Sequence, residues 1–526
     1  MCNILISRKK SFLLLVFTFF VICNIKGQLY GDFPYEERFD KQTKPIDISL
    51  PVPGNVNYSN SATFTLNGLR LTEAKTQQFG AVFVNNRQFS SVNGIQIEFE
   101  YSMYGGNGGA DGFTFFLFDA SVANPTIGAV GAGLGYSYNR ATDDHPGYRN
   151  KGLSGAYLGI SFDNYGNFKQ RRYQGEALVN GINWTSSAFS SINYKSHVTL
   201  RGAKGKVINS AISMENTSGL SDGYTGYPVL ITQTTSGSLL NNRKGIILNT
   251  DGTYSTFSGY SGNFELGSSG YTTDPLNSNY RKAIIKMYPH IDGGFLITVQ
   301  IQHGSTITTV IDNYHYRTSV NYIENTIVPY GDYWGSTNYA AYSATYNIDA
   351  SIPQFLKFGF SASTGAYTNY HYIRMVKITL PRAAEAYNDF VQTYSGISTT
   401  IDALTNDLGY TDIVSQNQEG NSINLDKSTF KFINNDNVVS TTPYEYNEPG
   451  VGVWKYNPTT GLVTFTSLPS FIGTATINYS IKAGKNGELP YADEAYRSLP
   501  ASITVVVEKA INTHVISNRF IQPTIK

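Results

Sequence analysis

Residues Gly108–Phe118 read GGADGFTFFLF, and this stretch decides the fold expected for the chain around it. The glycines at 105, 106, 108 and 109 allow backbone angles that residues with a β-carbon avoid, so the chain can turn sharply before Asp111. The apolar side chains that follow alternate between two strand faces: Phe113, Phe115 and Leu117 on one, Phe116 and Phe118 on the other. A strand that is apolar on both faces is typical of burial on both sides. The sequence therefore predicts a rigid buried strand with an exposed acid, Asp111, at its loop tip.

The composition favours an all-β protein. The chain has 526 residues, which is enough for two to four domains, with 50 glycines, 14% aromatic residues and only 15% charged residues. Many short strands joined by glycine-rich turns give such a composition. The formal charge of +1 falls to about −3 once the basic leader is removed. Nucleic acid is therefore not an expected partner, because its binding requires a basic face.

Residues 1–27 have the pattern of a secretory signal peptide. Basic residues precede the apolar run Phe12–Cys23, and cleavage is expected near Gly27. The apolar run is short for a membrane span, so no integral span is expected in the mature chain. Both cysteines of the chain lie in this leader, so the mature chain must fold without disulfides. The expected location is secreted or at the cell surface.

Short strands fill residues 28–380. The stretch Ile95–Tyr101 alternates apolar and polar residues, which predicts a half-buried antiparallel strand. Further strands are predicted at Tyr157–Phe162, His197–Arg201, Arg281–Tyr288, Phe295–Gln302 and Leu356–Ala362. No convincing amphipathic helix interrupts them. These strands predict one large domain of two packed antiparallel sheets, with its function carried by loops.

A second, smaller β-sandwich is predicted for residues 398–508, after a polar linker at 381–397 and before a short polar tail at 509–526. The segment Gly450–Ile481, with Trp454, resembles the repeat modules of bacterial surface fibrils and cadherin-like adhesins. Asn406 and Asp407 match the Asn-Asp pair near the start of such modules. The resemblance implies an immunoglobulin- or cadherin-like spacer in a surface adhesion protein.

Three pieces of the large domain resemble legume-type (L-type) lectins. The turn at Asp111 is similar to their ADG turn, in which the aspartate accepts hydrogen bonds from two sugar hydroxyls. The glycine-rich stretch 128–136 resembles the loop that gives these lectins a backbone N–H for the sugar, and the segment 355–373 resembles their GFSA strand and turn. The resemblance implies a concanavalin A-like jelly-roll sandwich. The sugar-binding residues it implies are Asp111, Gly131, Ala132, Gly133, Asn167, Tyr367 and Asn369.

A calcium loop is predicted directly after the strand at 157–162. Asp163, the carbonyl of Tyr165 and Asn167 place oxygens at i, i+2 and i+4 around a bend, which suits Ca²⁺. The same loop resembles the metal loop of L-type lectins, where the asparagine also contacts the sugar, and Glu176 could supply a further oxygen. No transition metal is expected, because Ser161 stands where the family has a glutamate. The basic residues Lys169, Arg171 and Arg172 weaken cation binding, and the alternative is an Asx-rich turn that satisfies its own backbone.

The predicted function is non-catalytic glycan or polysaccharide binding in adhesion. One alternative is a structural adhesin that binds proteins, for example through the tyrosine-rich stretch Tyr330–Tyr346. Another is a glycoside hydrolase of the same architecture, which needs two carboxylates in one cleft, whereas the strand ending in GISFDNYG has Asp163 as its only acid. The sequence GLSDG at 219–223 fits a serine-hydrolase pattern by letter but lacks the strand and helix around it. The chain is therefore expected not to be an enzyme.

Overall fold

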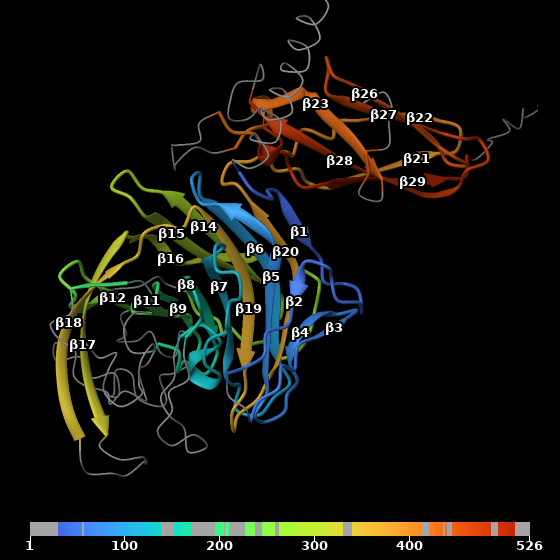
Figure 1. Cartoon of the computed structure of the whole chain (residues 1–526). Coiled ribbons are helices and arrows are strands. Elements are labelled where there is room, and N and C mark those ends of the chain that lie inside the picture. The colour runs from blue at the N-terminus through green and yellow to red at the C-terminus, as the bar shows by residue number, and fades with distance from the viewer. Residues whose placement is uncertain are drawn as a thin grey trace, which may run out of the picture. The chain divides into compact units, whose positions relative to one another are not determined.

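Figure 1 shows the computed structural model of the chain. It describes residues 30–510 apart from 55–56, 138–151, 170–194, 205, 210–226, 237–244, 258–261, 330–338, 412–419, 435–436, 439–443 and 485–492. The chain divides into two compact units, Met1–Pro381 and Arg382–Lys526. The division falls at the start of the segment predicted as a linker.

The first unit contains two large sheets. One has nine antiparallel strands in the order β13-β12-β11-β9-β8-β7-β19-β5-β2. These strands are β13 (Tyr254–Phe257), β12 (Gly245–Leu248), β11 (Val229–Thr234), β9 (His197–Arg201), β8 (Ala156–Asp163), β7 (Gly112–Asp119), β19 (Phe355–Ser363), β5 (Phe79–Ser90) and β2 (Ile48–Ser49). The GGADGFTFFLF stretch thus supplies a central strand, β7, between β8 and β19.

The other large sheet has eight strands in the order β16-β15-β14-β6-β20-β4-β3, and β1 also pairs with β20. They are β16 (Thr306–Tyr316), β15 (Phe295–His303), β14 (Arg281–Pro289), β6 (Ile95–Tyr104), β20 (Tyr370–Thr379), β4 (Gly68–Thr72), β3 (Thr63–Thr65) and β1 (Tyr35–Glu37). A smaller sheet contains β10 (Lys206–Asn209), β18 (Tyr339–Asp349) and β17 (Ser319–Pro329).

Aromatic side chains join the two large sheets. The ring of Phe99, on β6, lies 5.9 Å from the rings of both Phe113 and Phe115 on β7. The same ring lies 5.6 Å from Phe162 on β8 and 5.1 Å from Phe360 on β19. All five rings are fully buried, and each such aromatic pair adds about 0.5–1.5 kcal/mol beyond its area burial. The sheets therefore pack face to face, with their core at the face of β7 that carries Phe113 and Phe115.

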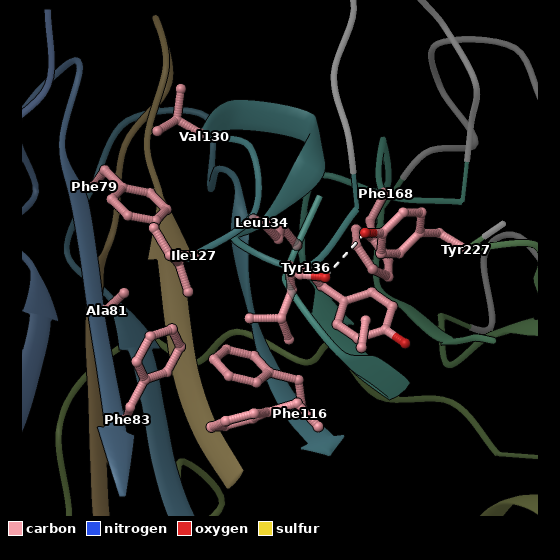
Figure 2. Close-up of a cluster of buried hydrophobic side chains, with 13 residues drawn as sticks. Phe79, Ala81, Phe83, Phe116, Ile127, Val130, Leu134, Tyr136, Phe168 and Tyr227 are labelled. Carbon is pink, nitrogen blue, oxygen red and sulfur yellow. Dashed lines mark hydrogen bonds between the residues drawn. The ribbon is translucent and has the colours of Figure 1, made fainter. Parts of the chain in front are cut away.

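The outer face of the nine-stranded sheet is covered as well. Figure 2 shows the loop residues Ile127, Val130, Leu134 and Tyr136 packed over Phe116 of β7. Tyr136 packs against β8 at Gly159. Only glycine fits at this position, because a β-carbon there would lie 2.6 Å from the tyrosine ring. This second core confirms that β7 is buried on both faces, and it fixes the glycine-rich loop to the sheet.

The second unit is a smaller sandwich. One sheet has the order β21-β29-β28-β23-β24 and the other β22-β27-β26-β25. The strands are β21 (Asp389–Tyr394), β22 (Ser398–Ile401), β23 (Leu425–Asn434), β24 (Asn437–Val438), β25 (Glu445–Glu448), β26 (Gly452–Asn457), β27 (Leu462–Ser467), β28 (Gly473–Ala483) and β29 (Ala501–Glu508). Trp454 is fully buried between these sheets, and its indole N–H donates to Glu448 at 2.9 Å. Strand β21 lies inside the predicted linker.

The predicted fold class is confirmed: both units are β-sandwiches, and almost all of their strand pairs are antiparallel. The described residues contain only short 3-10 turns besides the strands, among them η1 (Gly131–Gly133), η6 (Ser422–Asn424) and η8 (Glu494–Tyr496). No helix in the described part of the chain is long and apolar enough to cross a membrane.

Candidate functional site

Asp111 directly precedes β7, and two neighbouring segments hold its backbone. Its N–H donates to the carbonyl of Ser363 at 2.9 Å, and its own carbonyl accepts the N–H of Tyr165 at 2.8 Å. The next residue is glycine because β7 and β8 approach closely here: a β-carbon at Gly112 would lie 2.6 Å from the Cα of Asp163. The turn is therefore locked between the end of β19 and the loop that follows β8.

The prediction that Asp111 is exposed is wrong, since the residue is only 6% exposed. The cause is the pair of backbone contacts just described, which brings the β19 end and the β8 loop over the turn. Burial, together with the nearby charge of Asp163, raises the pKa of Asp111 to about 8. No described residue donates a hydrogen bond to the Asp111 carboxylate, so its acceptor capacity is unused by this part of the chain.

The glycine-rich loop comes to the same end of the sandwich. The N–H of Gly131 donates to the hydroxyl of Ser363 at 2.9 Å, so Ser363 bonds both this loop and Asp111. Residues 131–133 form the turn η1, in which Gly131 and Ala132 are half-buried and Gly133 is buried. Of the three predicted backbone donors, Gly131 is thus already engaged within the chain.

The predicted calcium loop folds around the carboxylate of Asp163, which is fully buried. One carboxylate oxygen accepts the N–H of Gly166 at 2.6 Å, and the other accepts the N–H of Phe168 at 2.6 Å. Burial raises the pKa of Asp163 to about 6, opposed by these bonds and by the positive charge of Lys169. The loop therefore contains the self-satisfied turn that the sequence offered as the alternative to a metal site.

Asn167 lies between the two residues that Asp163 holds. Its side chain is 7% exposed, and its amide oxygen is buried without any hydrogen-bond partner. A buried amide oxygen without a donor costs roughly 1–3 kcal/mol. The described contacts thus leave Asp111 and Asn167, on two joined loops, with unused polar groups.

Asn164 connects these loops and was not singled out from the sequence. Its side-chain amide donates to the carbonyl of Gly109 at 2.8 Å and accepts the N–H of Gly267 at 3.2 Å. A β-carbon at Gly109 would lie 2.7 Å from that amide nitrogen. The only signal in the sequence is its position after Asp163 at a strand end, which does not separate it from an ordinary turn residue.

Tyr367 lies at the loop that follows β19 and is 46% exposed. Its ring packs beside that of Tyr165 with 5.8 Å between centroids, which places an aromatic pair next to the Asp111 turn. Asn369 is different: it is 4% exposed, and its side-chain oxygen accepts the N–H of Gly106 at 3.3 Å. The predicted sugar-contacting residue Asn369 is thus a buried support of the loop at 105–109.

Calcium ligands are scarce in this arrangement. The described residues contain no group of three or more His, Cys, Asp or Glu side chains that could hold a metal. Both carboxylate oxygens of Asp163 already accept short hydrogen bonds from backbone N–H groups. Of the predicted side-chain ligands in the described residues, only the amide oxygen of Asn167 has no hydrogen-bond partner. Ca²⁺ takes six to eight oxygens, so these residues do not fit it. The ion stays a prediction that the contacts do not favour, and Glu176 lies outside the described residues.

Other sequence features have simpler explanations or are not described. His371 is fully buried, its Nδ1 lies 2.6 Å from the hydroxyl of Thr72, and burial lowers its pKa to about 3. It is a neutral residue of the sheet. The GLSDG stretch and residues 330–338 of the tyrosine-rich segment lie outside the described part of the chain.

Of the comparisons with known proteins, only the one with solved structures finds similar proteins. No family model matches the chain, and no curated protein matches its sequence. The VIP36 exoplasmic/lumenal domain in its Ca²⁺/Man3GlcNAc-bound form is 12% identical, with 66% of this chain and 90% of that chain covered and a TM-score of 0.29. Peanut lectin is 13% identical, with 66% and 99% covered and a TM-score of 0.29. The Bauhinia forficata lectin in complex with GalNAc is 12% identical, with 66% and 99% covered and a TM-score of 0.28.

These neighbours are L-type lectins at low identity, and the VIP36 structure contains bound Ca²⁺. The class of the first unit, a large two-sheet antiparallel sandwich, rests on its strand order and register.

Proposed function

We propose that the first unit is a non-catalytic glycan-binding module, and that the chain is a secreted or surface-exposed adhesion protein. One observation carries the proposal. The Asn167 amide oxygen has no hydrogen-bond partner, and the Asp111 carboxyl receives no hydrogen bond from the described residues, on two loops that the Tyr165–Asp111 bond joins. A buried carboxylate without donors costs free energy, and sugar hydroxyls supply the missing donors.

The proposed capture involves no bond-making. Asp111 accepts hydrogen bonds from two sugar hydroxyls, the Asn167 amide exchanges hydrogen bonds with a neighbouring hydroxyl, and a backbone N–H of Ala132 or Gly133 donates. The exposed ring of Tyr367 stacks on the apolar face of the sugar. Above the Asp111 pKa of about 8, where the carboxylate is charged, each of its hydrogen bonds contributes about 1.5–3 kcal/mol, less the competition of water.

Firm adhesion requires several copies of the protein on one surface. With affinities between millimolar and micromolar for each site, several copies on one surface are needed for firm attachment. We assign to the second unit, with its resemblance to adhesin repeats, the role of spacer. The leader at 1–27 directs the chain to secretion.

The test is a glycan array probed with the full-length chain and with Asp111→Asn, which keeps the shape but replaces one carboxyl oxygen, an acceptor, with an NH₂ group that only donates. We expect the substitution to abolish the signal while the unfolding transition is retained. Asp312→Asn, at an exposed aspartate on β16, is the matched control and should bind as the wild type does. Undiminished binding by Asp111→Asn would place the sugar elsewhere.

A structural adhesin without sugar recognition is the second candidate, and simple glycans would fail to inhibit its adhesion. The hydrolase alternative requires a second available carboxylate. Asp163 is the nearest one, but it is fully buried and both of its oxygens hold backbone N–H groups. Release of reducing ends from a polysaccharide would nevertheless identify an enzyme.

A further inference from the structure

In the 163–168 loop, Gly166 and Phe168 each form hydrogen bonds through both the backbone N–H and the backbone carbonyl. Gly166 donates its N–H to Asp163, and its carbonyl accepts the ammonium of Lys169 at 2.7 Å. Phe168 also donates its N–H to Asp163, and its carbonyl accepts two guanidinium N–H groups of Arg201 at 2.7 and 3.0 Å. The loop is therefore clamped between one carboxylate and two cations.

Both cations are built into the interior. Lys169 is fully buried and Arg201, on β9, is 2% exposed. The guanidinium of Arg201 lies 4.9 Å from the centroid of the Phe168 ring and donates a further bond to the carbonyl of Tyr227 at 2.8 Å. Buried cations of this kind persist where each has defined hydrogen-bond acceptors.

The loop already has a cation beside its carboxylate. The positive charge of Lys169 acts on the buried carboxylate of Asp163, and Lys169 and Arg201 are both buried as well. A divalent cation bound by the same loop would meet the Lys169 ammonium in a poorly screened interior, where like charges repel strongly. The predicted ligand Asp163 would also have to release the N–H groups of Gly166 and Phe168 that it now accepts.

We propose that Lys169 and Arg201 take the place of a bound metal ion in this loop. They fix the backbone conformation of the loop and so position Asn167, and the loop keeps this conformation without calcium. Lys169 and Arg201 are positioning residues, since they act through the loop backbone. This inference does not depend on sugar binding, because the shape of the loop is measurable without any glycan.

The test is calorimetric unfolding of the full-length chain in excess EDTA and in millimolar CaCl₂, where we expect the first unit to give its own transition. We expect the wild-type midpoint to be the same in both, and CaCl₂ titrated into the chain to give no binding heat. A midpoint that rises with calcium, or stoichiometric binding of Ca²⁺, overturns the proposal.

Two substitutions separate the clamp from ordinary packing. Lys169→Gln removes the ammonium, and we expect it to lower the first transition by about 5 °C or more, because the carbonyl of Gly166 and the Asp163 charge lose their cation. The matched control, Lys357→Gln, changes a half-buried lysine of β19 and should shift the midpoint by less than about 1 °C. Equal, small shifts in the two variants would show that Lys169 does not hold the loop. Should Lys169→Gln fail to fold, the calcium response of the wild type still decides the proposal.

Discussion

The backbone carbonyl of Asp111 accepts the N–H of Tyr165 at 2.8 Å, so the turn before β7 is bonded directly to the loop after β8. Any change that separates β7 from β8 at this end must therefore displace both of the polar side chains assigned to the glycan.

Gly112→Ala should disrupt the site from within the sheet. The added β-carbon would lie 2.5 Å from the carbonyl oxygen of Phe162 and 2.6 Å from the Cα of Asp163, both of them backbone atoms. We expect a loss of about 1–3 kcal/mol in the free energy of unfolding, together with weaker glycan binding. Gly365→Ala is the control, because a β-carbon there meets nothing within 4 Å. Equal stability of the two variants would contradict the close approach of β7 and β8.

Ser363→Ala should loosen the glycine-rich loop. The hydroxyl of Ser363 is the acceptor for the N–H of Gly131, and its removal leaves that donor without its partner. We expect a loss of about 0.5–1.5 kcal/mol and a measurable fall in glycan affinity by titration calorimetry. Ser269→Ala removes an exposed hydroxyl bond to Asn279 and should leave affinity unchanged. If both variants bind equally well, the loop at 131–133 takes no part in capture.

Tyr367→Ala should lower glycan affinity with little change in the free energy of unfolding. The ring is 46% exposed and contacts Tyr165, so its removal should cost little in unfolding free energy, yet it removes the proposed stacking surface. We expect glycan affinity to fall about tenfold, equivalent to about 1.4 kcal/mol. Tyr394→Ala, in the second unit, removes a ring of similar exposure, 49%, and should bind like the wild type. Full binding by Tyr367→Ala would exclude stacking on this ring.

The second unit should lose stability as the pH rises towards neutrality. Burial raises the pKa of Asp407 to about 7, although the carboxylate accepts bonds from the Tyr387 N–H and the Tyr479 hydroxyl. The folded state therefore holds a proton that the unfolded chain, with an aspartate pKa of about 3.9, releases. Stability falls between about pH 4 and pH 7 for this reason.

Asp407→Asn tests this dependence, since the amide keeps an oxygen acceptor and cannot ionise. Calorimetry of the second transition between about pH 5 and pH 8 should show a flatter profile in the variant. Glu445→Gln, at an exposed residue of β25, should retain the wild-type slope. An unchanged slope in Asp407→Asn would assign the pH dependence to other groups, with Asp389 the first to examine, because burial raises its pKa to about 6.

The strands could be predicted from the sequence where apolar residues alternate, as in β6 and β7. Strand β21 could not be predicted, because it lies in a polar segment and its aromatic residues Phe390 and Tyr394 are exposed. Its strand conformation comes from pairing with β29, which is distant in the sequence. The burial of Asp111 also escaped prediction, since Ser363 and Tyr165 reach it from distant parts of the chain. The sequence indicated that Lys169 opposes a cation, but only the fold shows that its ammonium is buried against the loop.

The pairing of β21 with β29 has a mechanical consequence for the second unit (Figure 1). These strands, close to the two ends of the unit, run parallel over six residue pairs, from Asp389 beside Ile503 to Tyr394 beside Glu508. A force that pulls the ends of the unit apart drags the two strands past each other lengthwise and loads their hydrogen bonds together. Such shear resists tension far better than the one-by-one unzipping of a hairpin.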